Sequence, residues 1–326
     1  MEKLDNIRTT VGSDWSEYER FLRNSLHSGS RYVENILNYI VTHRGKGVRP
    51  LLVLLSSALN RDGRPVNDAT FTAAMMVEMI HTASLIHDDV VDEAYMRHDK
   101  PSVNALWRSR DAVLVGDFIL ARCFSISLGS GHTEIVTHIA NCIDRLSEGE
   151  LQQSHHSRTL ALTREEYMDI IYKKTASLLS VCCTCGAIAA GADNDRRQTM
   201  KLYGDRLGVA FQIKDDILDY LSGPTGKPHL SDLRERKITL PLLLVLEAAP
   251  VADRRRLLRL LSDVRTRPAN APLIRDAVIA AGGIDAATQT MEQYLLEARQ
   301  ALDNYPPSLH KEALIEFTHF IGKREK

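Results

Sequence analysis

Two groups of aspartates with the same spacing stand far apart in this chain. Each reads D-D-x-x-D, with Asp88, Asp89 and Asp92 in the first motif and Asp215, Asp216 and Asp219 in the second motif. Both motifs lie in apolar stretches with helical spacing, where residues four apart share a face. Carboxylates on such a face need a cation, and Mg²⁺ combines a few carboxylates with waters and substrate phosphates. The motifs therefore predict two facing helices that clamp a diphosphate through magnesium.

Cationic residues with suitable spacing accompany the first motif. Lys46 and Arg49 stand in Gly45-Lys46-Gly47-Val48-Arg49-Pro50, just before a predicted helix. Two cations beside a helix N-terminus, with glycines that allow close backbone approach, can hold an anion. His81 precedes Asp88 by seven positions and so lies on the same helix face. A solvated basic loop is the alternative interpretation of Lys46 and Arg49 taken alone.

Residues that suit phosphate binding also accompany the second motif. Lys174 and Thr175 precede it, Gln212 lies one turn before Asp215, and Lys227 and Lys237 follow it. Lysines placed around an aspartate cluster suit the capture of phosphate over magnesium. A single lysine is more often a surface residue, so it is the set that favours this function.

The elements that must position these residues are helices. Apolar residues recur at spacings of three and four, Gly and Pro mark the connections, and strand signals are almost absent. We expect helices near 14–27, 30–43, 50–59, 67–95, 103–128, 132–154, 163–191, 194–221, 237–248, 251–262, 270–281 and 284–303. Since the two motifs must meet, we predict one large all-α domain over 1–326, with 1–28 as a peripheral helix.

Composition narrows the class of protein. The chain has 326 residues, 44% hydrophobic and 25% charged, with a formal net charge of −1, which gives no sign of a nucleic-acid partner. Its five cysteines are an odd number, and we expect them to be buried and free of disulfides. The charged start and the short uncharged stretch Thr175–Ala192 predict neither a signal peptide nor an integral membrane segment. We expect a cytoplasmic enzyme.

In the order of these motifs the chain resembles the trans-polyprenyl diphosphate synthases. The two aspartate motifs look like that family's two aspartate-rich motifs. The other matching blocks, in the family's order, are Gly45-Lys46 to Arg49-Pro50, Arg97 with Lys100-Pro101, Lys174-Thr175, Phe211-Gln212 and Gly226-Lys227-Pro228. The resemblance covers about residues 30 to 245. It implies an isoprenoid-synthase bundle around a deep central cavity, a homodimer, and Mg²⁺-dependent condensation of isopentenyl diphosphate with an allylic diphosphate.

The resemblance also assigns roles to single residues. Asp88, Asp92 and Asp215 would bind magnesium, supported by Asp89, Asp216 and Asp219. The allylic diphosphate would be held by Arg97, Lys174, Thr175, Gln212, Lys227 and Lys237, of which Lys174, Thr175, Gln212 and Lys227 are the expected catalytic group. Isopentenyl diphosphate would be held by Lys46, Arg49, His81 and His98. The final proton is expected to pass to the departing pyrophosphate or to Thr175.

The chain departs from the family pattern in three places. His98-Asp99 replaces the usual Arg-Gly, which predicts weaker binding of isopentenyl diphosphate because His is less reliably charged. Arg44 and Gly47 stand where the first basic block usually has Gly and Arg. Leu230 replaces a Gly in the loop after Lys227, which leaves the path of that loop open.

The residues just before the first motif predict a long product. In the family, the fourth and fifth positions before the first aspartate flank the tunnel for the growing chain, and aromatic residues there block it. Here these are Ser84 and Ala83, both small. We expect a product beyond four isoprene units, with octaprenyl favoured, of the kind used as a quinone side chain. Close packing between helices is the alternative interpretation of these two small residues. If they flank the tunnel, Ala83→Phe should shorten the product.

Several other functions are compatible with parts of the sequence. A shorter-chain synthase, making geranylgeranyl or farnesyl diphosphate, shares the motifs. His87-Asp88 could be the metal pair of an HD-type phosphohydrolase, but this leaves the second motif unexplained. A terpene cyclase normally mixes Asn, Ser and Glu in its second metal motif. A non-catalytic subunit of a heteromeric synthase tends to lose aspartates, and both motifs are intact here.

Overall fold

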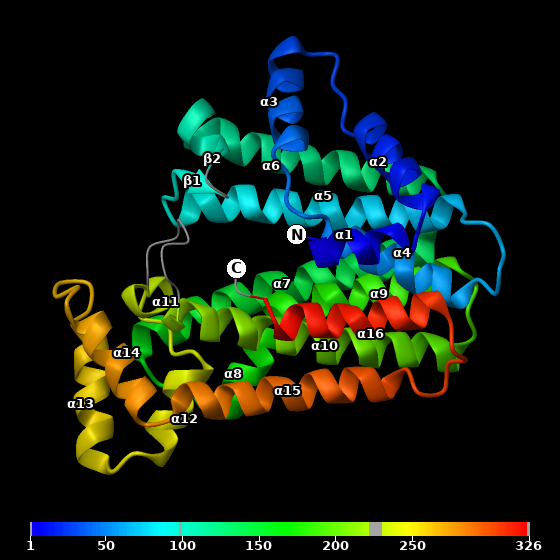
Figure 1. Ribbon diagram of the computed structural model, residues 1–326. Coiled ribbons are helices and arrows are strands. Elements are labelled where there is room, and N and C mark those ends of the chain that lie inside the picture. Colours follow the sequence, from blue (N-terminus) through cyan, green and yellow to red (C-terminus); the bar gives the residue numbers. More distant parts are fainter. Residues whose placement is uncertain (1, 98–99, 222–229, 325–326) are drawn as a thin grey trace. The chain divides into compact units, whose positions relative to one another are not determined.

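The computed structural model describes residues 2–97, 100–221 and 230–324, and this part of the chain is almost entirely helical (Figure 1). Its α-helices are α1 (Glu2–Thr9), α2 (Ser13–Ser25), α3 (Arg31–Thr42), α4 (Val48–Asn60), α5 (Asp68–Val91), α6 (Val103–Gly129), α7 (Thr133–Thr159), α8 (Arg164–Ile171), α9 (Ser177–Ala189), α10 (Asn194–Leu221), α11 (Ser231–Arg234), α12 (Leu240–Ala248), α13 (Val251–Ser262), α14 (Asn270–Ala280), α15 (Gly283–Ala301) and α16 (Leu309–Gly322). A π-helix, η1 (Tyr172–Ala176), joins α8 to α9, and the strands β1 (Met96–Arg97) and β2 (Lys100–Pro101) pair antiparallel. The predicted all-α class is confirmed.

Most predicted helices are found within a few residues of the expected bounds. The helix expected over 163–191 is interrupted by η1, which divides it into α8 and α9. The helix expected over 67–95 ends at Val91, because Glu93 has a left-handed backbone with φ of 50°. Helices α11 and α16 were not predicted, and α1 lies in the segment 1–28, which was expected as one peripheral helix.

The chain forms two compact units, each built from several stretches of sequence. The first unit comprises Met1–Asn141, Val181–Lys201 and Pro306–Leu314. The second unit comprises Cys142–Ser180, Leu202–Tyr305 and Ile315–Lys326. The first aspartate motif therefore belongs to the first unit and the second motif to the second unit. The single domain expected over 1–326 stays a prediction.

In the first unit, α5 is a core helix that packs against α4 and α6 (Figure 1). It is long and apolar enough to cross a membrane, but 78% of its most apolar window is buried within the protein. Helix α4 is equally apolar, and Pro50–Asn60 are all buried. Helices that are apolar on all sides are typical of a protein core. The face of α5 near its C-terminal end then carries the first aspartate motif.

A glycine allows α5 and α6 to approach closely near that motif. A Cβ atom on Gly116 of α6 would lie 2.2 Å from Nε2 of His87 on α5. The same nitrogen lies 3.2 Å from the carbonyl oxygen of Val113. Any larger residue at Gly116 would displace the His87 ring, which directly precedes Asp88.

The N-terminal segment 1–28, expected as a peripheral helix, forms two helices whose apolar residues are buried. Helix α2 packs against α4, α5 and α6. Tyr18 and Leu22 on α2 are 1% and 2% exposed, and Leu4 and Ile7 on α1 are equally buried. These helices therefore contribute to the core of the first unit.

In the second unit, a close contact between α10 and η1 positions two predicted site residues. A Cβ atom on Gly208 would lie 2.5 Å from the Cα atom of Ala176. Because Gly208 has no side chain, α10 can lie directly against η1, and Gln212, one turn later, meets Thr175.

The five cysteines of the chain are all buried and free, as predicted.

Candidate active site

The first aspartate motif occupies the last turn of α5 and the residue after it. The backbone N–H of Asp92 donates to the carbonyl oxygen of Asp88 at 2.8 Å, so these two residues are one helical turn apart as their spacing predicts. Asp88 is half-buried and Asp92 is exposed. The last turn of α5 thus presents two carboxylates that solvent and ligands can reach.

The middle aspartate of the first motif has a different environment. Asp89 is 3% exposed and accepts three hydrogen bonds from Arg97, at 2.7 to 3.0 Å. The guanidinium thereby neutralises a buried carboxylate and connects β1 to the end of α5. Arg97, predicted to hold the allylic diphosphate, remains 33% exposed while it makes this pair.

The basic segment predicted to bind isopentenyl diphosphate lies at the start of α4. Gly47 has a left-handed backbone with φ of 66°, and this turn leaves the Lys46 side chain exposed. The backbone carbonyl of Lys46 accepts a hydrogen bond from Arg8 at 2.8 Å. Arg49 lies on α4 and His81 on α5, and these two helices pack together. The first unit therefore carries Lys46, Arg49 and His81 on neighbouring elements.

The second aspartate motif lies in the last two turns of α10. Asp215 is 41% exposed and pairs with the guanidinium of Arg324. The Arg324 guanidinium also lies over the ring of Phe211, 4.4 Å from its centroid, and the side chain is only 13% exposed. The sequence analysis missed Arg324, because nothing in the C-terminal segment indicates that it meets a motif more than 100 residues earlier.

The last aspartate of the second motif, Asp219, is fixed by hydrogen bonds to the start of α11. Asp219 accepts hydrogen bonds from the backbone N–H and the hydroxyl of Ser231 and from the backbone N–H of Asp232. Burial and the nearby Asp219 raise the pKa of the Asp232 carboxyl to about 7. Asp219 thus anchors the start of α11 and lies close to the carboxyl group of Asp232.

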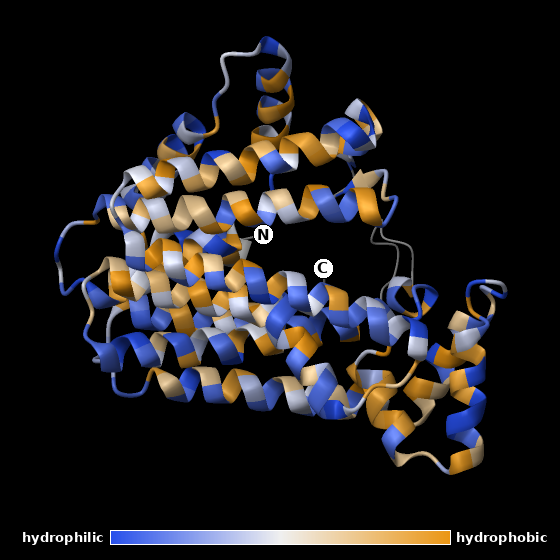
Figure 2. Cartoon of the chain, turned by 180° about the vertical axis from the view of Figure 1, so that it is seen from behind, coloured by the Kyte–Doolittle hydropathy of each residue, from blue (hydrophilic) through white to orange (hydrophobic). Residues whose placement is uncertain are grey.

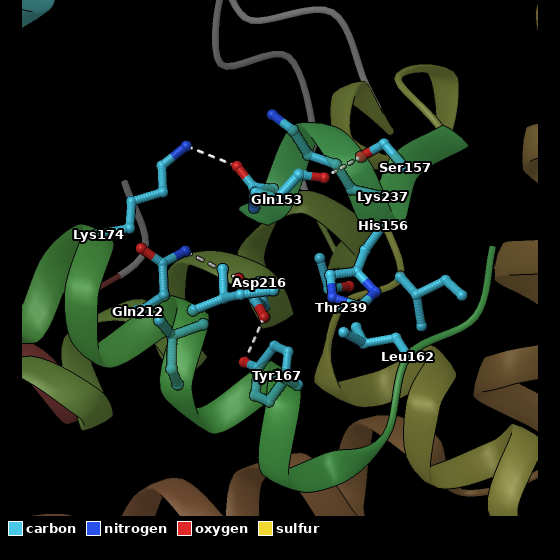
Figure 3. A pocket seen from close by; sticks show the side chains of 13 residues that line it. Gln153, His156, Ser157, Leu162, Tyr167, Lys174, Gln212, Asp216, Lys237 and Thr239 are labelled. Carbon is cyan, nitrogen blue, oxygen red and sulfur yellow. Dashed lines mark hydrogen bonds between the residues drawn. The ribbon is translucent and has the colours of Figure 1, made fainter. Parts of the chain in front are cut away.

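A chain of hydrogen bonds runs from Thr175 to the buried Asp216, and Figure 3 shows its part from Gln212 to Asp216. The Thr175 hydroxyl donates to Gln212 Oε1 at 2.6 Å, and Gln212 Nε2 donates to Asp216 Oδ1 at 2.9 Å. The Tyr167 hydroxyl donates to Asp216 Oδ2 at 2.6 Å. Burial raises the pKa of the Asp216 carboxyl, although these hydrogen bonds oppose the rise. Asp216 therefore fixes the orientation of Gln212 and, through it, of Thr175.

Lys174 lies beside this chain, on the π-helix. Its Nζ donates to Gln153 Oε1 at 2.6 Å and pairs with Glu150 at 2.7 Å. Lys174, Gln212, Asp216 and Lys237 line one pocket of the second unit, shown in Figure 3. π-Helical turns occur often at functional sites because they change the direction of side chains along a helix. The second unit thus brings Lys174, Thr175, Gln212 and Lys237 together around its motif.

Two of the predicted site residues, His98 and Lys227, lie outside the described residues.

The structure also bears on the alternative that His87 and Asp88 form the metal pair of a phosphohydrolase. The His87 ring is directed at α6, where Nε2 lies 3.2 Å from Val113 O and 3.5 Å from Asp117 Oδ1. The His87 ring therefore packs between α5 and α6, and its contacts are with α6.

The donor set fits a magnesium ion that is completed by its substrate. Among residues 2–97, 100–221 and 230–324, no three His, Cys, Asp or Glu side chains gather as a preformed metal cage. Mg²⁺ does not require such a cage, because it is usually held by one or two carboxylates together with waters and phosphates. Asp88 with Asp92, and Asp215, provide accessible carboxylates of this kind.

Comparisons with known proteins agree with this arrangement. The family model of the polyprenyl synthetases matches residues 30–277. The chain is 32% identical to octaprenyl diphosphate synthase of Escherichia coli K12 over 99% of both chains. It is 34% identical to a short chain isoprenyl diphosphate synthase of Methanothermobacter thermautotrophicus, over 88% of this chain and 89% of the relative.

A solved structure shares the fold over nearly the whole chain. A polyprenyl synthase from Caulobacter crescentus, complexed with calcium and isoprenyl diphosphate, superposes with a TM-score of 0.91. It is 31% identical, and the match covers 99% of this chain and 98% of that one. The chain therefore belongs to the polyprenyl synthetase family and is a prenyltransferase with the all-α isoprenoid synthase fold.

Proposed function

We propose that this protein is a Mg²⁺-dependent, long-chain all-trans-polyprenyl diphosphate synthase. It would condense isopentenyl diphosphate head to tail onto an allylic diphosphate. The observation that carries the proposal is the pair of complete aspartate motifs, each with carboxylates open to ligands and a buried aspartate that orients its neighbours. A subunit without catalytic activity would have no need for the oriented chain Thr175–Gln212–Asp216.

The proposed site residues have two roles, which are to bind the substrates and to stabilise the charge of the leaving pyrophosphate. Asp88, Asp92 and Asp215 would hold magnesium, which supplies positive charge to the departing pyrophosphate. Lys174, positioned by Gln153 and Glu150, adds a further cation for the allylic diphosphate. Such preorganised charge favours cleavage of the allylic C–O bond, because negative charge develops on the leaving oxygen.

Thr175 is the residue that we propose to take part in the final proton transfer. Its hydroxyl hydrogen is directed to Gln212 Oε1, so that a lone pair of the hydroxyl oxygen can accept a hydrogen bond from another side. The proton lost from the new prenyl unit would pass to the departing pyrophosphate, either directly or through this hydroxyl, which would accept it while giving its own proton to the pyrophosphate. Replacing Thr175 with Val tests the second path by its effect on kcat.

The proposal of a long product rests on Ala83, Ser84 and the relatives. Ala83 is fully buried in α5, and Ser84 is half-buried, with its hydroxyl bonded to the carbonyl of His81. Neither side chain is large enough to obstruct a prenyl chain. The octaprenyl diphosphate synthase of Escherichia coli matches 99% of the chain, which favours a product of that class. Use of this product as a quinone side chain is part of the proposal. The similarity to a short chain synthase makes a shorter product the second candidate.

One incubation separates these functions. Purified protein is supplied with Mg²⁺, isopentenyl diphosphate and an allylic diphosphate, and the product is analysed by mass. A long prenyl diphosphate supports the proposal, and a product of four isoprene units or fewer supports the second candidate. No product from the protein alone would indicate a heteromeric enzyme, and phosphate released from the allylic diphosphate alone would indicate a hydrolase.

We also propose that the protein is a homodimer that uses the exposed face of α6. Helix α6 is apolar along much of its length (Figure 2), yet only 33% of its most apolar window is buried. Leu114 and Leu128 both follow the kink at Arg108, lie fourteen positions apart and so on one face, and are 54% and 66% exposed. A second copy of α6 would cover these side chains, because symmetric dimers bury the same surface of both subunits.

Charge on this face should therefore separate the dimer. We expect Leu114→Glu to convert the protein from a dimer to a monomer, since a carboxylate would be buried without a partner at the interface. Sedimentation velocity measures the change. Leu273→Glu on α14 is the matched control, because Leu273 is also 54% exposed, and it should leave the dimer intact. A wild-type monomer would contradict the proposal.

Removing Arg324 should strengthen metal binding at the second motif. The Arg324 guanidinium pairs with Asp215, so a divalent cation must compete with it for that carboxylate. We expect Arg324→Ala to lower the Kd for Mn²⁺, used in place of Mg²⁺, by about threefold to tenfold. Electron paramagnetic resonance of free Mn²⁺ measures this without substrate. Lys323→Ala changes the adjacent exposed residue and should have no effect, whereas weaker binding by Arg324→Ala would refute the competition.

A further inference from the structure

Lys46, which is predicted to bind isopentenyl diphosphate, stands between two glycines. Gly45, Lys46 and Gly47 have no regular secondary structure, and Gly47 has a left-handed backbone with φ of 66°. Glycine has the widest range of backbone conformations, so a lysine between two glycines has no fixed direction of its own. The 45–47 segment therefore needs contacts from other elements to hold Lys46 in one place.

Arg8 on α1 provides one of these contacts. Its Nη2 donates to the backbone carbonyl oxygen of Lys46 at 2.8 Å, and its Nη1 donates to Asp5, three residues earlier on α1, at 3.0 Å. A hydrogen bond from a charged donor is stronger than one between neutral groups, and the Arg8 side chain is only 27% exposed. This bond fixes the orientation of the peptide group that joins Lys46 to Gly47.

Trp15 on α2 contacts the same segment. A Cβ atom on Gly47 would lie 2.6 Å from the Trp15 ring, so the Gly47 backbone lies directly on the indole. The Arg8 guanidinium lies over this ring, 4.4 Å from its centroid, which adds a cation–π interaction. Arg8, Trp15 and Lys46 also line one small pocket. The arginine and the indole thus support each other as they hold the 45–47 segment.

The two helices that provide these contacts are anchored in the first unit. Leu4 and Ile7 of α1 are both 2% exposed. Asp14 on α2 pairs at 2.8 Å with Arg61, which directly follows α4. Helix α2 also packs against α4 itself, the helix that the 45–47 segment precedes. A support of this kind can restrict a segment that is flexible by its own sequence.

We propose that Arg8 is a positioning residue that holds Lys46 toward the diphosphate of isopentenyl diphosphate. The inference rests on the proposed function. A lysine is a point charge on a flexible stem, so a fixed backbone lowers the cost of ordering it when the ligand binds. Arg8 acts through Lys46, because its Nη atoms are engaged with Asp5 and with the Lys46 carbonyl. Its effect is therefore on the binding of one substrate and not on the bond that breaks.

Arg8→Met tests this role because it removes the hydrogen bond and the charge and keeps a long apolar side chain. We expect the Kd for isopentenyl diphosphate, measured by calorimetry without the allylic substrate, to rise about fivefold to tenfold. The KM for the allylic diphosphate and the kcat at saturating isopentenyl diphosphate should stay within about twofold of wild type. Arg8→Lys keeps a cation and should recover part of the affinity. Arg23→Met, at an exposed arginine of α2, is the matched control and should change none of these values.

A double-mutant cycle with Lys46 distinguishes positioning from direct binding by Arg8 and from a general loss of structure. If Arg8 acts through Lys46, Arg8→Met should add little to the loss of affinity caused by Lys46→Gln. Effects that simply add, an unchanged Kd in Arg8→Met, or equal weakening of both substrates would overturn the inference.

Hydrogen exchange tests the support of the segment without any substrate. The backbone amides of residues 45–48 should exchange faster in Arg8→Met than in the wild type, and those of the buried helix α5 should not. Unchanged exchange at 45–48 would contradict the inference. Failure of the proposed function looks different, since the wild-type protein would then neither bind isopentenyl diphosphate nor form product, whatever the exchange rates of Arg8→Met.

Discussion

Replacing Asp88 with Asn is expected to lower kcat by about a thousandfold or more, because one carboxylate charge at the predicted magnesium site is lost. The substitution keeps the size of the side chain. Asp88 is half-buried at the end of α5, so the folded state should tolerate a neutral amide there. Steady-state kinetics with both substrates measure the loss, and thermal unfolding should give nearly the same Tm as the wild type.

Asp89→Asn is the informative comparison, since it changes the adjacent residue of the same motif. Asp89 is 3% exposed and accepts three hydrogen bonds from Arg97. Loss of its charge should lower the free energy of unfolding by about 2 kcal/mol, because Arg97 would keep a charge without its partner. Stability should thus fall in Asp89→Asn and activity in Asp88→Asn. An active Asp88→Asn protein would exclude Asp88 as a metal ligand.

A bulky residue at Ser84 should change the product from a long to a short prenyl diphosphate. Ser84 lies one turn before Asp88 and on the same face of α5, where a chain growing from the aspartates would pass. We expect Ser84→Phe to remove several isoprene units from the product while the first condensations continue. Mass analysis of the products measures the change directly.

The structure makes Ser84 a better position for this test than Ala83. Ala83 is fully buried, and Ala83→Phe would force a phenyl ring into a packed core, at a cost of about 1–3 kcal/mol or more. Ser84 is half-buried and can accept a larger side chain with less disturbance. Thr82→Phe, on a different face of α5, is the control and should leave the product length unchanged. If Ser84→Phe makes the wild-type product, the growing chain does not pass this residue.

Local patterns in the sequence were sufficient to identify most of the helices. The spacing of apolar residues at three and four predicted α10 with its observed bounds and α13 likewise. Such patterns act over a few turns, so they need no knowledge of distant residues. The π-helix η1 lies inside a continuous helical pattern, and its wider turn lies against Gly208 of α10, a contact that the local pattern does not contain.

The sequence alone determined that this protein is helical, carries two carboxylate motifs and resembles the polyprenyl diphosphate synthases, because residue type and spacing along a helix decide these features. Only the tertiary structure decided what each aspartate of a motif does. Asp88 and Asp89 are adjacent and chemically identical, yet one is accessible and the other is buried against Arg97. Asp215 meets Arg324, and Asp216 meets Tyr167, through contacts between distant segments. The environment of a charge depends on packing, and packing brings together residues that no local pattern relates.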